Sequence, residues 1–130
     1  MSKLVLGARV LFGMIFLVFG VNSVLHFLPE PDMTPQGKAF IDGLVAAPYL
    51  FPIVKAIEVL AGGMVLSGMF VPLALILIAP ITINILLYHV FLDPQGLAMA
   101  IALVILQLII AWGYWPSFQG VLARQGAKKV

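Results

Sequence analysis

The amino-acid sequence predicts an all-α protein, an integral membrane bundle of four transmembrane helices that forms a single domain over residues 1–130. Apolar residues make up 63% of the chain and charged residues only 9%, and the mean hydropathy is +1.17. A soluble domain is about half apolar and about a quarter charged. So few charges could not cover a globule of this size in water.

Four apolar segments have the length of about 20 residues that a helix needs to cross a bilayer. They cover residues 4–28, 49–70, 71–92 and 96–115. Between the first two, the apolar positions 40, 41, 44 and 45 alternate with polar ones, which predicts a short amphipathic helix in this loop. The second and third helices join at "SGMFVP". So short a connection predicts a tight antiparallel hairpin.

The basic residues predict how the chain is oriented. With four spans both chain termini lie on one side, where the sequence places Lys3, Arg9, Arg124, Lys128 and Lys129. The opposite side carries Lys38 against the acids Glu30, Asp32, Asp42 and Asp93. The positive-inside rule then makes both termini cytoplasmic. Arg9 is expected to extend towards the lipid head groups of that face.

Composition also excludes several kinds of site. The chain has no cysteine, so it cannot form a disulfide, a thiolate metal site or a thiol nucleophile by itself. Its two histidines, His26 and His89, are too few for a zinc site without carboxylate ligands, and no metal site is predicted. Basic patches interleaved with polar residues are lacking, so no nucleic-acid partner is expected. The partner that the composition does predict is the lipid bilayer.

Polar residues of three helices are predicted to lie in the same, outer half of the bilayer. At 1.5 Å per residue, Lys55 lies roughly 8 Å and Glu58 roughly 13 Å below the outer end of the second helix. Both are candidate catalytic residues, since ionisable groups inside a membrane are more often functional than structural. The predicted ligand-binding cluster is Asn22, His26, Lys55, Glu58, Asn84, Tyr88 and His89.

Each of these residues also has a structural interpretation. Lys55 and Glu58 can form an ion pair that only holds helices together, since an unpaired charge at the bilayer centre costs about 3 kcal/mol. Asn22 and Asn84 can form bonds between helices worth about 0.6 kcal/mol each. His26 and His89 lie near the interface, where histidine is tolerated, and His89 can face the lipid head groups.

The segments "ARVLFGMIFLVFGVNSVLHF" and "KAIEVLAGGMVLSGMFVPLALILIAPITINILLYHVFLD" resemble the DoxX family of small bacterial membrane proteins. The most telling parts are K-x-x-E-x-x-x-G on the second helix and N-x-x-x-x-H-x-F at the end of the third. The resemblance implies a multi-pass protein of the bacterial inner membrane with both termini cytoplasmic. It also implies a link to respiratory redox chemistry, because the family is named after a subunit associated with thiosulfate:quinone oxidoreductase. The resemblance supplies no set of catalytic residues that could be assigned to this chain.

Three functions follow as hypotheses. In the first, the chain binds a quinone, or passes protons to it, as a membrane subunit of an oxidoreductase that works with a redox partner protein or as a homo-oligomer. The chain has no flavin, haem or nicotinamide motif, so it would be at most such a subunit, with no covalent cofactor. In the second, it is a non-catalytic structural or assembly subunit. In the third, it resembles small four-helix multidrug exporters, although those carry their glutamate on the first helix.

Overall fold

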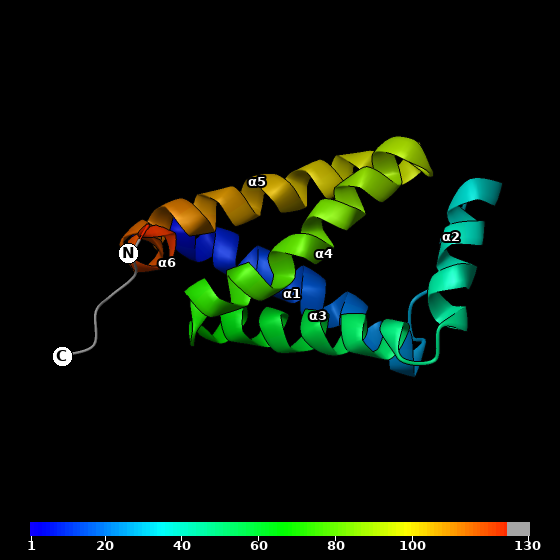
Figure 1. Ribbon diagram of the computed structural model, residues 1–130, viewed down its shortest axis with the longest axis horizontal. Helices are drawn as coiled ribbons and strands as arrows, with labels where there is room; N and C mark the ends of the chain where they lie inside the picture. Colours follow the sequence, from blue (N-terminus) through cyan, green and yellow to red (C-terminus); the bar gives the residue numbers. More distant parts are fainter. Residues whose placement is uncertain (125–130) are drawn as a thin grey trace.

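The structure, a computed structural model, describes residues 1–124 and is helical through most of that length. Lys128 and Lys129, on which the predicted orientation of the chain in the membrane partly depends, lie outside the described residues. The elements follow one another as α1 (Lys3–Leu25), α2 (Pro35–Ala46), α3 (Leu50–Ser67), α4 (Val71–Phe91), the 3₁₀ turn η1 (Pro94–Gly96), α5 (Leu97–Gly113) and α6 (Trp115–Leu122). The N-terminus and α6 lie at one end of the bundle and α2 at the other (Figure 1). We call these the terminal end and the α2 end.

Within residues 1–124, four helices are long and apolar enough to cross a membrane, as the sequence predicts: α1, α3, α4 and the helical segment Pro94–Gly113. The structure ends α1 at Leu25, three residues before its predicted end, because His26 adopts the left-handed conformation with φ 52°. The tight hairpin between α3 and α4 is also present. Its turn places Gly68 and Phe70 at positive φ, and the Gly68 and Met69 N–H groups bond to the Met64 carbonyl.

The helices α1 and α3 pack closely because glycines stand where they cross. A Cβ atom on Gly13 would lie 2.9 Å from the Gly62 carbonyl oxygen, and one on Gly62 would lie 2.9 Å from the Leu17 nitrogen. Either side chain would therefore push one backbone away from the other. Small residues at such crossings let membrane helices gain van der Waals contact and are typical of membrane bundles.

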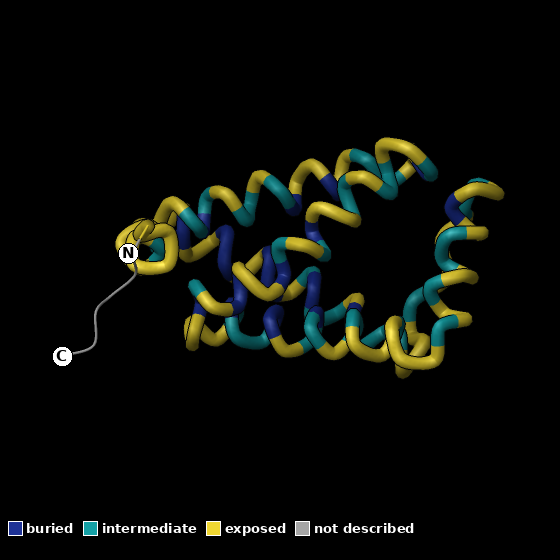
Figure 2. The backbone as a smooth tube through the Cα atoms, viewed as in Figure 1, coloured by how far each residue is buried: buried dark blue, intermediate teal, exposed yellow. Residues whose placement is uncertain are grey.

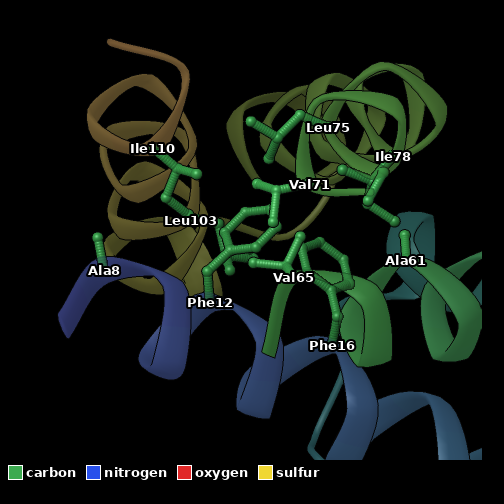
Figure 3. Close-up of a cluster of buried hydrophobic side chains, with 11 residues drawn as sticks. Ala8, Phe12, Phe16, Ala61, Val65, Val71, Leu75, Ile78, Leu103 and Ile110 are labelled. Atoms are coloured by element: carbon green, nitrogen blue, oxygen red, sulfur yellow. The ribbon is translucent and has the colours of Figure 1, made fainter. Parts of the chain in front are cut away.

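The hydrophobic core lies towards the terminal end, where all four long helices meet (Figure 2). Phe12 and Phe16 of α1 meet edge to face, with ring centroids 4.9 Å apart. Around them pack the fully buried side chains of Val65 from α3 and Ile78 from α4, together with Ile110 from α5 (Figure 3). This half of the molecule is therefore held by interlocking apolar side chains.

The α2 end is packed much less tightly. From their shared turn, α3 and α4 diverge towards this end, and α2 lies across the opening (Figure 1). The buried residues of α3 fall between Glu58 and Val65, and those of α4 between Val71 and Thr82. The parts of the two helices nearest the α2 end, residues 50–57 of α3 and 83–91 of α4, contain no buried residue. The divergence leaves room for a cleft between the helices.

The expectation that Arg9 extends to lipid head groups is wrong, because its side chain is buried at the terminal end. Its Nε donates to the Val65 carbonyl at 3.0 Å and its Nη2 to the Leu66 carbonyl at 3.3 Å. These carbonyls belong to the last turn of α3, and the Val65 carbonyl also accepts the Gly68 N–H at 3.3 Å. The turn otherwise lacks the N–H donors that a further helical turn would provide. The guanidinium supplies those donors, and its charge matches the negative end of the helix dipole.

We expect Gly13→Ala to destabilise the bundle by about 1–3 kcal/mol, because the added methyl group overfills the contact between α1 and α3. Gly63→Ala is the matched control, since a Cβ atom there meets nothing within 4 Å. Alanine also favours helix over glycine, so the control should melt no lower than the wild type. Thermal unfolding in detergent measures both, and equal melting temperatures would contradict the proposed contact.

Replacing Arg9 with Met should lower stability by about 1–2 kcal/mol, at about 1 kcal/mol per lost hydrogen bond. The Leu66 carbonyl loses its side-chain donor, whereas the Val65 carbonyl keeps the Gly68 N–H. Arg9→Lys should recover only part of this, because one ammonium group lacks the forked donors of a guanidinium. Lys3→Met, at an exposed position of the same helix, is the control. If Arg9→Met unfolds at the same temperature as Lys3→Met, the capping role is refuted.

Candidate functional site

A polar cleft of about 900 Å³ opens at the α2 end. We call it the α2-end cleft. Its walls come from the connection between α1 and α2, from α2, from the first turns of α3, from the last turn of α4 and from η1. Its polar lining consists of Glu30, Asp32, Lys38, Asp42, Lys55, Tyr88, His89, Asp93 and Gln95.

Lys55 and Glu58 form an ion pair on one face of α3, as their spacing suggests. The Lys55 Nζ lies 3.0 Å from Glu58 Oε2, and the side chains are 26% and 6% exposed. Lys55 Nζ also lies 5.3 Å from the centroid of the Phe51 ring. Glu58 lies towards α1, where a Cβ atom on Gly20 would approach the Glu58 Cβ to 3.5 Å. The lysine therefore reaches the cleft, and the carboxylate lies behind it between two helices.

Tyr88 and His89 form the α4 side of the cleft. Their rings meet at 85° with centroids 4.9 Å apart, and Tyr88 also packs against Phe40 of α2 at 5.6 Å. The His89 Nδ1 lies 2.8 Å from the carbonyl oxygen of Asp93. Because a carbonyl only accepts, Nδ1 carries the proton, and Nε2 keeps a lone pair for another partner. The sequence leaves open whether His89 faces the bundle or the lipid head groups, and the structure places it in the lining of the cleft.

The start of α2 is attached to the end of α4. The Thr34 hydroxyl donates to the Leu92 carbonyl, and its oxygen accepts the Gly37 N–H at 3.0 Å, which caps α2. Gly37 is buried, and a Cβ atom there would lie 2.6 Å from the Tyr88 hydroxyl oxygen. Only glycine lets α2 approach Tyr88 this closely. These contacts hold α2 over the cleft.

Two of the acidic residues in the cleft lining have local partners. Asp42 binds Lys38 at 2.8 Å across one turn of α2, and both side chains are 63% exposed. The hydrogen bond to Asp42, and then its charge, raise the pKa of Lys38 above its usual value. Asp93 is buried and accepts the Gln95 N–H at 3.4 Å, which caps η1. Both pairs belong to the walls of the cleft.

Besides Glu58, three residues of the predicted cluster do not line the cleft. Asn22 accepts the Leu28 N–H at 2.7 Å through Oδ1 and thereby stabilises the turn that ends α1. His26 is exposed at that turn. Asn84 is exposed on α4 and lines two other, largely apolar hollows. The structure therefore brings together Lys55, Tyr88 and His89, with Glu58 behind the lysine.

Sequence reasoning missed the residues of the cleft that come from α2 and the connections. Helix depth could not place them, because they lie outside the long helices. The available signal was charge: Glu30, Asp32, Asp42 and Asp93 all fall in connections at the same end of the bundle. Such a concentration marks that end as water-facing and indicates a polar opening there.

No protein-family model, curated protein or solved structure matches this chain. Within residues 1–124, His, Asp and Glu side chains form no group of three that could hold a metal ion. The Lys55 ammonium and the Tyr88 phenol are donors that suit a ligand with oxygen acceptors, and the lone pair on the His89 Nε2 suits a ligand hydroxyl group.

We expect Lys55→Met to destabilise the protein by about 3 kcal/mol, because it leaves a buried carboxylate without its partner. Glu58→Gln should cost less, since the ammonium it leaves unpaired can reach the water of the cleft. The double substitution should be more stable than Lys55→Met alone. A double-mutant cycle of thermal unfolding in detergent measures this coupling, and strictly additive effects would contradict the pairing.

Proposed function

We propose that this chain is a DoxX-like membrane subunit of a redox complex in a bacterial inner membrane, and that its α2-end cleft binds the head group of a quinone. The observation that carries the proposal is the convergence of Lys55, Tyr88 and His89 on one cleft from two helices. A quinone head has two carbonyl oxygens that accept hydrogen bonds. The lysine ammonium supplies donors from α3 and the tyrosine hydroxyl supplies one from α4.

The pair Lys55–Glu58 gives the cleft a proton donor. Reduction of a quinone to a quinol adds two electrons and two protons, and the protons end on the two carbonyl oxygens. Lys55 donates one proton at the ligand and is reprotonated from the water of the cleft, which also supplies the second proton. The Glu58 carboxylate, whose oxygen lies 3.0 Å from the Lys55 Nζ, stabilises the ammonium form of the lysine. The electrons come from a redox partner protein, since the sequence has no motif for a redox cofactor. The chain is thus the quinone-binding part of a larger enzyme.

The proposed orientation places the α2 end outside the cell and both termini in the cytoplasm. Among the described residues, Lys3 and Arg124 support it at the terminal end, and the acidic connections support it at the α2 end. Helix α2 then lies at the outer membrane interface. A partner that delivers electrons to the cleft would dock on this face.

A structural or assembly subunit is the second candidate, and one observation favours it. Glu58 is buried and already paired with Lys55 of the same helix, so neither charge needs a ligand to balance it. In that case the acidic rim of the cleft docks a partner protein and the cleft binds no ligand. The two candidates differ in what Tyr88 does, since its hydroxyl matters only to a ligand in the cleft.

A quinone without a long tail should stabilise the purified protein in detergent in a saturable way, by about 2.7 kcal/mol at a hundredfold excess over its Kd. Tyr88→Phe should weaken this binding roughly tenfold, as expected for one lost hydrogen bond of about 1.4 kcal/mol. Tyr49→Phe is the matched control, because Tyr49 is 65% exposed at the same end and does not line the cleft. Thermal shift titrations measure all three proteins.

The structural candidate predicts a different pattern. The wild type would gain no stability from any quinone, and Lys55→Met would lower the melting temperature with no other effect. Equal binding by Tyr88→Phe and Tyr49→Phe would also contradict the proposed head-group site.

A further inference from the structure

An apolar groove of about 600 Å³ runs between α1 and α3 and meets the α2-end cleft at Lys55. Its α1 wall includes Gly20 and Val24, and its α3 wall includes Ala56 and Val59. Phe51 and Lys55 line both the groove and the cleft. The two hollows therefore share a wall, with apolar surface on one side of it and polar groups on the other.

Lys55 is the polar group of this groove that can accept a new partner. The Ser23 hydroxyl, which also lines it, already donates to the Gly20 carbonyl at 2.6 Å. The ammonium group of Lys55 has three N–H donors. Within residues 1–124, the one ionic partner of Lys55 is Glu58. The side chain is still 26% exposed. A ligand oxygen at Lys55 would satisfy a donor that the apolar groove leaves free.

We propose that this groove holds the hydrocarbon tail of the quinone whose head group lies in the cleft, and that the ligand arrives from the bilayer between α1 and α3. This inference rests on the function proposed above and adds to it the class of substrate: a lipid quinone with a hydrocarbon tail. The head passes Lys55 into the cleft, and the tail stays on the apolar side. Phe51 contacts the ligand where the two parts join.

A second apolar hollow, of about 550 Å³, gives the alternative path. It lies between α3 and α4 beneath α2, with Phe40 and Pro80 in its lining. It shares no lining residue with the cleft, and the packed rings of Phe40 and Tyr88 stand beside it. A tail in this hollow could not continue directly from a head group at Lys55.

The test compares two quinones that share a head group. One has no tail and the other carries at least two isoprene units. We expect Ala56→Phe to lower the ratio of their affinities, tailed over tailless, at least tenfold, because the new ring fills the groove. Ala39→Phe is the matched control, since Ala39 is likewise an exposed helical alanine but lines the second hollow. It should leave the ratio within twofold of the wild type.

Val24→Phe repeats the test from the α1 wall, where Val24 is 74% exposed and tolerates a larger side chain. It should also lower the ratio. If Ala39→Phe lowers the ratio and Ala56→Phe and Val24→Phe do not, the tail lies beneath α2 and the inference is overturned, while the quinone site stands. If the wild type binds neither quinone, the proposed function itself has failed. An unchanged ratio in all three variants would also overturn the inference.

Discussion

The close packing of α1 against α3 is the constraint on which the other features of this molecule depend. Two glycines, Gly13 and Gly62, let the backbones meet where a side chain on either would collide with the other helix. The contact continues along α1 to Gly20, where a Cβ atom would come within 2.7 Å of Val59 Cγ2. Glu58 is buried on this side, so the same contact that builds the core shields the carboxylate of the candidate site.

Ionisable groups stabilise the two ends of the bundle in different ways. At the terminal end Arg9 completes the last turn of α3, and its donors are used on carbonyl groups of the protein. At the α2 end Lys55 has an acid partner and is still partly exposed to an open cleft. The donors of Arg9 are used within the protein, so its role is structural. Lys55 keeps donors available for a ligand, which is why we place ligand chemistry at the α2 end.

The four long helices were predictable because hydropathy and length alone decide which segments can cross a bilayer. The pairing of Lys55 with Glu58 was predictable too, since residues three apart lie on one face of a helix. The environments of Arg9 and His89 were not, because they depend on which helix packs beside them and on where α2 lies. The hydrogen bond from the Leu28 N–H to Asn22 was not predictable either, because it forms only where α1 ends before Leu28.

Photoaffinity labelling would show whether the α2-end cleft binds the head group of a quinone. A quinone with a photoreactive group on its ring would be activated with the intact protein in lipid vesicles, and the adducts mapped by mass spectrometry. We expect adducts on Lys55, Tyr88 or His89 that an excess of unlabelled quinone removes. Adducts spread over the exposed faces of the helices, and unaffected by competition, would contradict the proposed site.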